Sequence, residues 1–301
     1  MENIVKKAIV PIAGMGTRFL PLSTVLPKEL WPLADFPAIQ YIIEEAKDSG
    51  IQEIIFVISS DKKAVVDYLN VLSGKKKVAN MPKLEKMLME RKKTDALESL
   101  RQLQDSMQDL SFSYVVQKKP LGDGDAVLQA AKFVGDEPVA VLFGDDIVDA
   151  KIPCLAQLFS VFKTGEKPVL ALYRLPKEKL SSYGVVDIEK IANRLYKIKN
   201  IIEKPAMGEE PSDLAVVGKY ILTPEVFSHL KKITPDRTGE VRLAGAFDRM
   251  IKDDKIIYGY EFDGKWLECG SKLDWLKSNF YFSLRHPQYG ESLKNFVKEI
   301  L

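Results

Sequence analysis

The sequence has few cysteines and few histidines, and this excludes several kinds of site. Cys154 and Cys269 are the only cysteines among 301 residues and no CxxC spacing occurs, so a disulfide framework is not expected. His229 and His286 are the only histidines. Both are expected in or beside helices, and the sequence offers no Ser-His-Asp or Cys-His set for nucleophilic catalysis.

Net charge and long apolar runs are also missing. Lys and Arg number 44 against 42 Asp and Glu, and the resulting net charge of +2 argues against a nucleic-acid or membrane partner. No stretch reaches the roughly 18 uninterrupted apolar residues of a membrane span. The apolar run near the N-terminus is too short for a signal peptide. We therefore expect a soluble, cytoplasmic protein.

What is present is enough apolar sequence for a large core. Hydrophobic residues make up 46% of the chain and charged residues 29%, as in folded globular proteins. An apolar strand is predicted at 6–14, an amphipathic helix at 36–50 and a β-branched strand at 51–59. This order predicts an α/β fold whose largely parallel sheet is covered by helices on both faces. Without a repeat or a Gly/Ser linker, residues 1–301 are expected to form a single domain.

Two segments depart from this alternation of strands and helices. Residues 61–110 are rich in Lys, Glu and Leu, with leucines at helical spacing, which predicts a helical insert. The lysine run at 75–77 within it is expected on the solvated surface. Residues 272–301 are predicted to form a C-terminal helical tail.

Two glycine-rich loops are candidates for ligand binding. GMGTR, at 14–18, directly follows the first apolar strand, and its glycines would let backbone N–H groups approach an anion beside Arg18. It is not a Walker A loop, and Phe19 stands where GxGxxG would have its third glycine. Lys28 could reach a phosphate as a point charge. The glycines of PLGDGDA, at 120–126, would allow close approach to a flat base. Ordinary strand-to-helix turns are the alternative for both loops.

Several carboxylates follow later strands. GDD, at 144–146, ends an apolar strand, where α/β folds place ligands, and its oxygens suit Mg²⁺. In EKP, Glu203 can accept hydrogen bonds from hydroxyl groups and Lys204 can pair with a phosphate. Glu268 and Gly270 end the WLECG segment. The alternatives are a polar turn, a surface ion pair and a partly buried aromatic turn.

The order of these motifs is more informative than any one of them. Along the chain they read GMGTR, PKEL, QKKPLGDGDAV, LFGDD, YGVVD, IIEKP, VGKYILTPEVF, TGEVRLAGA and WLECG. From about Lys6 onward, this series resembles the bacterial UTP–glucose-1-phosphate uridylyltransferases, within the wider sugar-nucleotide pyrophosphorylases. The resemblance implies a mixed, mostly parallel sheet with a Rossmann-like nucleotide half and a sugar half. It also implies uridylyl transfer from UTP to glucose 1-phosphate with Mg²⁺ as cofactor, by a homodimer or homotetramer.

The resemblance further implies a role for each matching residue. The residues expected to bind the nucleotide are Ala13, Gly14, Met15, Gly16, Thr17, Glu29, Gln117 and Gly122, the last two recognising uracil. Those expected to bind the sugar are Gly184, Glu203 and Gly218. The catalytic residues implied are Arg18, Lys28, Asp145 and Lys204, with Lys204 on the sugar phosphate. Mg²⁺ is expected on Asp145 and Glu268.

Two departures from the family pattern concern acidic residues. The family's usual GLGHA loop reads GDGDA here, which would place Asp123 and Asp125 near the base. Glu268 stands where the family usually has Asp, and it is one methylene longer. Ser271 stands where an acidic residue is usual.

A third departure lies in TGEVRLAGA, where Arg242 and Gly245 replace the family's Gln and Asp and are expected to alter contacts near the sugar. Together the departures leave open the same chemistry with another sugar 1-phosphate or with thymidine triphosphate. They also leave open a catalytically silent regulatory homologue that binds a nucleotide sugar without turnover. A nucleic-acid-binding protein fits poorly with the charge balance.

Overall fold

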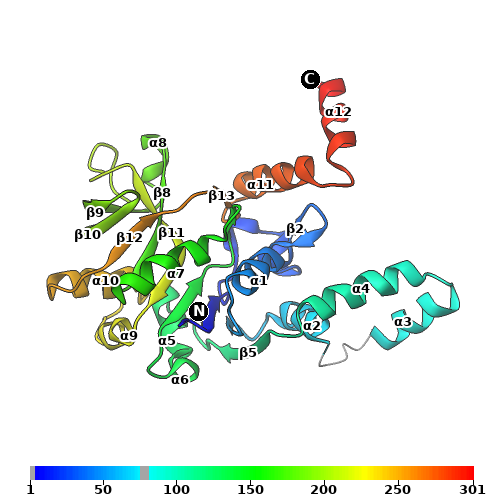
Figure 1. The fold of residues 1–301 in the computed structure, drawn as a ribbon, viewed down its shortest axis with the longest axis horizontal. Coiled ribbons are helices and arrows are strands. Elements are labelled where there is room, and N and C mark those ends of the chain that lie inside the picture. Colours follow the sequence, from blue (N-terminus) through cyan, green and yellow to red (C-terminus); the bar gives the residue numbers. More distant parts are fainter. Residues whose placement is uncertain (1–3, 75–80) are drawn as a thin grey trace.

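A computed structural model describes residues 4–74 and 81–301, so the lysine run at 75–77 lies outside the described residues. Within them, a central sheet has the strand order β5-β4-β1-β6-β11-β8-β12-β10-β9 (Figure 1). Its strands are β1 (Lys7–Pro11), β4 (Glu53–Ile58), β5 (Ser111–Val116), β6 (Val139–Leu142), β8 (Val169–Arg174), β9 (Gly184–Ala192), β10 (Leu195–Glu203), β11 (Leu214–Leu222) and β12 (Tyr258–Glu261).

The sheet is mixed, as the family resemblance implied, and most of its strands run in one direction. β5, β4, β1 and β6 are paired in parallel and form one half of the sheet. In the other half, β11 runs antiparallel to β6 and β8, and β10 runs antiparallel to β12 and β9. β8 and β12 are again parallel. Only β11 and β10 therefore oppose the common direction among the strands of this sheet.

Helices cover both faces of the sheet because successive residues of its strands point to opposite sides. In β4, Ile54 and Phe56 join one core cluster and Ile55 and Val57 join the other. The first cluster is covered by α1 (Ala38–Asp48), α2 (Lys63–Ser73) and α7 (Cys154–Gly165). The second is covered by α5 (Asp123–Gln129), α9 (Pro224–Leu230) and α10 (Leu243–Lys252). The short helices α6 (Ala131–Val134) and α8 (Lys177–Leu180) complete this part of the chain.

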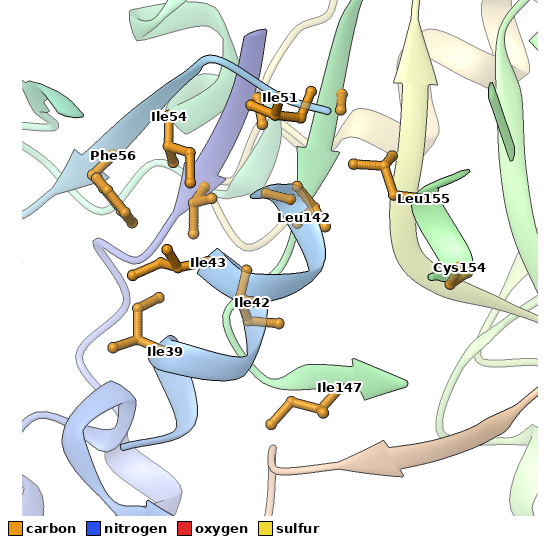
Figure 2. Close-up of a cluster of buried hydrophobic side chains, with 14 of the residues drawn as sticks. Ile39, Ile42, Ile43, Ile51, Ile54, Phe56, Leu142, Ile147, Cys154 and Leu155 are labelled. Carbon is orange, nitrogen blue, oxygen red and sulfur yellow. The ribbon is translucent and has the colours of Figure 1, made fainter. Parts of the chain in front are cut away.

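Helix α1 shows how sequence pattern becomes packing. Ile39, Ile42 and Ile43 recur at helical spacing, and all three are fully buried. Figure 2 shows Ile39 and Ile43 on the side of the helix toward Ile54 and Phe56 from β4, and Ile42 on the side toward Leu142 and Ile147. The helix predicted over 36–50 is thus confirmed, and it holds the loop that precedes it against the sheet.

Two helical segments extend from this α/β body (Figure 1). Between β4 and β5 lie α2, α3 (Met81–Glu90) and α4 (Thr94–Ser106), in the interval predicted as a helical insert. At the C-terminus, α11 (Lys272–Arg285) is followed by α12 (Gly290–Ile300), which packs on α11. None of the helices in the described part of the chain is long and apolar enough to cross a membrane.

A small ladder beside the main sheet positions the site. β7 (Asp146–Asp149) pairs antiparallel with β13 (Lys265–Glu268), and the register places Asp146 opposite Glu268. The backbone N–H of Cys269 donates to the carbonyl of Asp145 at 2.7 Å and extends this pairing. A second short ladder joins β2 (Pro32–Leu33) to β3 (Phe36–Pro37). Two acidic segments, far apart in sequence, therefore meet at the end of β6.

Candidate active site

Two adjoining cavities lie beyond the carboxyl ends of β1 and β6, where α/β folds place ligands. The first has a volume of about 390 Å³. Its walls are formed by Pro11, Ile12, Ala13, Gly14, Met15, Gly16, Thr17, Lys28, Glu29, Gln117, Pro120, Gly122, Asp123, Ala126, Phe143, Gly144, Asp145, Glu240 and Arg242. The expected nucleotide-binding residues are all among them.

The second cavity, of about 220 Å³, shares Asp123, Phe143 and Asp145 with the first. Its other walls are formed by Asp146, Leu170, Ser182, Tyr183, Gly184, Ile201, Glu203, Val216, Gly218, Tyr220, Leu243, Ala244, Phe247, Trp266 and Glu268. The expected sugar-binding residues Gly184, Glu203 and Gly218 lie here. The two groups of residues predicted from the sequence are thus separated into two connected spaces.

The glycine loop after β1 forms one wall of the first cavity. Gly16 has a φ of 65°, in the left-handed region that favours glycine, and the 3₁₀ turn Thr17–Phe19 begins directly after it. A side chain on Gly14 would meet no atom within 4 Å, so its backbone faces open space. Phe19 is buried, and its ring packs edge-on against Trp31 at a centroid distance of 4.6 Å. The residue that replaces a third glycine therefore anchors the loop.

Two ion pairs stand behind this loop. The Lys28 ammonium lies 2.6 Å from Oδ2 of Asp145, and that of Lys62 lies 2.7 Å from Oε2 of Glu29. Burial opposes the charges of Asp145 and Lys28, but their mutual attraction outweighs it, lowering the pKa of Asp145 and raising the pKa of Lys28. Arg18 further lowers the pKa of Asp145. The Lys28–Asp145 pair is therefore ionised at neutral pH.

The opposite wall of the first cavity comes from the loop before α5. Gln117 is buried, and its amide nitrogen donates to the carbonyl of Gly122 at 3.0 Å and to Oδ2 of Asp125 at 2.7 Å. The Asp123 carboxylate is bound by the backbone. Its Oδ1 accepts hydrogen bonds from the N–H of Gly124 at 2.7 Å and from the N–H of Leu243 at 3.0 Å. Burial raises the pKa of Asp123. The two aspartates of GDGDA are thus both engaged by the protein.

Three charged side chains converge where the cavities meet. A Cβ built on Gly270 would stand 3.0 Å from Oε1 of Glu268, 3.5 Å from Oδ2 of Asp145 and 3.6 Å from Nη1 of Arg18. Arg18 also donates to the carbonyl of Gly270 at 3.4 Å. Tyr183 donates its hydroxyl hydrogen to Glu268. Burial and the nearby carboxylates of Asp274 and Asp145 raise the pKa of Glu268.

This arrangement can hold a divalent cation. Two carboxylates from separate segments, Asp145 after β6 and Glu268 at the end of β13, face the same point beside Gly270. Mg²⁺ commonly takes only one or two protein carboxylates plus substrate phosphates. Residues 4–74 and 81–301 hold no cluster of three or more His, Cys, Asp or Glu suited to a metal. A cation here would therefore depend on a ligand for its remaining coordination.

Asp146 links the junction to the second cavity. Its Oδ1 accepts from Nε1 of Trp266 at 2.8 Å, and its Oδ2 accepts from the backbone N–H of Gly218 at 3.1 Å. Burial and the neighbouring Asp145 carboxylate raise the pKa of Asp146 to about 7. A Cβ on Gly218 would fall 2.3 Å from Oδ2 of Asp146, so only glycine permits this approach.

The far side of the second cavity joins the ends of two paired strands. Gly184 begins β9 opposite Glu203, which ends β10. Glu203 is exposed, so its carboxylate is accessible from the cavity. Lys204 has a φ of 50° and its backbone N–H donates to the carbonyl of Tyr183 at 2.9 Å. Within the described chain, neither cavity is lined by the Lys204 side chain, which is exposed beside the entrance residue Glu203.

Arg242 and Gly245, the two departures from the family pattern near α10, are not among the wall residues of the second cavity. Arg242 lines the first cavity rather than the second, and it pairs with Asp236 at 2.7 Å and with Glu240 at 2.8 Å. A Cβ on Gly245 would meet Ile233 at 3.3 Å, so this position packs against the protein. Arg242 therefore lies on the side of the first cavity and Gly245 packs against Ile233, and the effect of the two replacements on sugar contacts stays a prediction.

Several residues of the site have only weak sequence signals. Lys62 stands in a charged DKK triplet that is typical of a surface, yet its side chain is buried against Glu29. Tyr183 and Trp266 lie within noted motifs, but nothing local indicates that they contact Glu268 and Asp146. These contacts arise from segments that are distant in sequence.

Comparison with known proteins places this geometry in context. Residues 7–281 match the nucleotidyl transferase family. A UTP–glucose-1-phosphate uridylyltransferase of Staphylococcus haemolyticus is 39% identical over 296 residues, which cover 98% of each chain. The structure of a UTP-bound UGPase from Acinetobacter baumannii is similar with a TM-score of 0.87 and 33% identity, over 99% of this chain and all (100%) of the other. A UDP-glucose pyrophosphorylase complexed with UDP-glucose is similar with a TM-score of 0.80 and 33% identity, over 92% and 98% of the two chains.

Proposed function

Because this chain belongs to the nucleotidyl transferase family, we propose that it transfers the uridylyl group of UTP to glucose 1-phosphate, giving UDP-glucose and pyrophosphate. The observation that carries the proposal is the junction at Asp145, where two cavities meet beside Arg18 and Lys28. The first cavity is lined by the backbone of the glycine loop and by Lys28 and Arg242, which suits the phosphates of a nucleoside triphosphate, and its carboxylates are Glu29, Asp123, Asp145 and Glu240. The second is smaller and rich in carboxylates and aromatic rings, which suits a hydroxylated sugar.

In the first cavity, the nucleotide is positioned mainly by backbone. Ala13, Gly14, Met15, Gly16 and Thr17 cradle the phosphates with their N–H groups, and the open space around Gly14 supports this role. Gln117 and Gly122 bind the base. Glu29, held by Lys62, forms the floor of the same cavity. The triphosphate therefore points from the base toward the junction.

In the second cavity, Gly184, Glu203 and Gly218 bind the sugar. Glu203 accepts hydrogen bonds from sugar hydroxyls, while Gly184 and Gly218 leave room for the ring. Lys204 holds the phosphate of the sugar, and this role requires its exposed side chain to turn toward the junction when that phosphate is present. The sugar phosphate then lies next to the α-phosphate of the nucleotide.

The reaction is an in-line displacement. An oxygen of the sugar phosphate forms a bond to the α-phosphorus, and the bond from that phosphorus to the bridging oxygen of pyrophosphate breaks. The attacking oxygen is already an anion, so the chain needs no general base. Arg18 and Lys28 neutralise the charge that moves onto pyrophosphate. Mg²⁺, held by Asp145 and Glu268, supplies further charge neutralisation when bound.

The proposal extends to the setting in which the enzyme works. We expect a cytoplasmic homodimer or homotetramer that uses Mg²⁺. Apolar side chains exposed on α11 and α12 support self-association, and the most prominent are Leu273, Leu276, Phe280, Phe296 and Ile300. Light scattering at several protein concentrations measures the assembly directly, and a monomer throughout would contradict this part of the proposal.

The test of function is pyrophosphate release over a grid of substrates. UTP and dTTP are each paired with the 1-phosphates of glucose, galactose and N-acetylglucosamine, with Mg²⁺ and with EDTA in its place. The expected result is Mg²⁺-dependent release that is fastest with UTP and glucose 1-phosphate. Activity with another pair only would assign a different specificity. No release with any pair, with UDP-glucose still bound, would identify a silent regulatory homologue.

A further inference from the structure

The amide of Gln117 is held in one orientation by two acceptors. Its nitrogen lies 3.0 Å from the carbonyl oxygen of Gly122 and 2.7 Å from Oδ2 of Asp125. Neither neighbour can donate a hydrogen bond, because one is a carbonyl and the other a carboxylate. A flipped amide would place its oxygen against both. The two protons of the amide nitrogen are therefore committed to the protein.

This orientation determines what the side chain can offer a ligand. Gln117 is buried and lines the first cavity, and with its nitrogen committed it has only Oε1 to present there. The carbonyl oxygen is an acceptor and cannot donate. A freely rotating glutamine amide could bind either a donor or an acceptor of a ligand. The fixed amide of Gln117 can bind only a hydrogen-bond donor.

We propose that Asp125 is a specificity-determining positioning residue, which fixes the Gln117 amide so that the site selects a base with an imide N–H over cytosine. The inference rests on the proposed nucleotidyl transfer and on the base lying against Gln117. It concerns a position where this chain has an aspartate in the GDGDA loop. Asp125 acts through Gln117 and does not touch the base itself.

The selection follows from the edges of the bases. Uracil carries an N3–H donor, whereas N3 of cytosine is an acceptor with a lone pair. Oε1 of Gln117 would accept from the first and face the second as an acceptor against an acceptor. Leaving buried polar groups unpaired in this way costs about 1–3 kcal/mol, which corresponds to roughly 5- to 150-fold discrimination.

Thymine has the same N3–H as uracil, so this device cannot separate them. The preference for UTP over CTP is therefore expected to depend on Asp125, whereas the preference between UTP and dTTP is not. A substitution that merely loosened α5 would affect the three nucleotides alike. The pair of ratios thus separates positioning of Gln117 from a general structural role.

The deciding variant is Asp125→Leu, which removes the acceptor and keeps a side chain of similar size. We expect the UTP-to-CTP ratio of kcat/KM to fall about tenfold, since only Gly122 then holds the amide. The ratio for UTP against dTTP should stay within about twofold. Asp125→Asn keeps an oxygen that can accept from Gln117 and should retain most of the CTP discrimination.

The matched control is Gln129→Ala. The exposed Gln129 donates to the other carboxylate oxygen of Asp125 at 3.2 Å, so its removal leaves the contact between Asp125 and Gln117 in place. Both ratios should then equal those of the wild type. Calorimetric titration with UDP-glucose and CDP-glucose gives a second readout that needs no turnover, and Asp125→Leu should narrow the difference between their dissociation constants.

The outcomes separate this inference from the proposed function. If the wild type releases no pyrophosphate from UTP, and binds neither UDP-glucose nor CDP-glucose, the proposed function has failed. If the wild type strongly prefers UTP to CTP and Asp125→Leu preserves that ratio in both assays, the positioning role of Asp125 is overturned. A fall in the CTP discrimination alone supports it.

Discussion

The two cavities handle charge in opposite ways. In the first, the charged groups of opposite sign are matched, with Lys28 on Asp145 and Lys62 on Glu29. In the second, carboxylates gather, and burial raises the pKa of Asp146 to about 7 and also raises the pKa of Glu268. A triphosphate brings its own negative charge and needs cations already in position. A neutral sugar ring needs acceptors, and the acidic side chains supply them.

The two cavities also differ in the groups that hold their buried charges. Ion pairs hold the charged side chains of the first cavity in place, so this half is organised before any ligand arrives. The carboxylates of the second cavity are instead held by neutral donors, namely Trp266 on Asp146 and Tyr183 on Glu268. Asp145 lines both cavities, as Asp123 and Phe143 do, and it is the shared residue that pairs with Lys28.

The largest effect is expected at that shared residue. Asp145→Asn removes the charge that faces Lys28 and one of the two carboxylates proposed to hold Mg²⁺, and turnover should fall by about 1000-fold or more. Asp149→Asn, on β7 but hydrogen-bonded to Tyr281 away from both cavities, is the control and should stay near wild-type activity. Turnover of Asp145→Asn close to the wild type at limiting Mg²⁺ would contradict the assigned metal role.

The next effect should confirm that the first cavity depends on matched charges. Lys62→Met leaves the fully buried Glu29 carboxylate without its partner, which should lower the free energy of unfolding by about 3 kcal/mol. Urea denaturation measures this value. The double variant Glu29→Gln with Lys62→Met should recover most of it, because both charges are gone. Equal losses in the single and double variants would show that the pair is not what stabilises this wall.

A smaller effect should be confined to the second cavity. Trp266→Phe removes the indole donor from Asp146 but keeps an aromatic ring, so the KM for glucose 1-phosphate should rise about tenfold. The KM for UTP should be unchanged within about twofold. Steady-state kinetics with each substrate varied in turn distinguishes the two. A rise in the KM for UTP alone would contradict the assignment of the two substrates to separate cavities.

The smallest effect concerns the junction. Tyr183→Phe deletes only the hydroxyl that donates to the Glu268 carboxylate, and losing this one hydrogen bond is expected to weaken Mg²⁺ binding by about 1 kcal/mol. The concentration of Mg²⁺ at half-maximal activity should rise about fivefold. The dissociation constant of Mn²⁺, followed by magnetic resonance, should rise by a similar factor. No shift in either measurement would show that Tyr183 does not hold Glu268 for the ion.

Much of the fold could be predicted from the sequence because its elements carry local patterns. The apolar spacing of Ile39, Ile42 and Ile43 identifies α1, a β-branched run identifies β4, and an apolar run identifies β6. Strand order could not be obtained this way. Nothing in the residues of β11 indicates that it enters the sheet between β6 and β8, because pairing partners are chosen by the whole chain.

The residues of the site could be predicted where they belong to a recognisable sequence motif. The glycine loop and Asp145 stand in recognisable positions after strands, and the structure brings them to one cavity. Lys62 was missed because a lysine in a charged segment is usually exposed, and only its contact with Glu29 reveals it. The place of Arg242 in the wall of the first cavity could not be predicted either, since it depends on the salt bridges to Asp236 and Glu240.

The packing of the glycine loop has an optical consequence. The sequence holds three tryptophans, and all of them lie at the site or on its supports. Trp31 contacts Phe19 of the loop, Trp275 contacts Trp31 at a centroid distance of 4.8 Å, and Trp266 donates to Asp146. Indole emission depends on the surrounding polarity and on neighbouring groups. We therefore expect the intrinsic fluorescence of the unlabelled chain to change when a ligand fills either cavity, so that binding could be followed in real time without an attached dye.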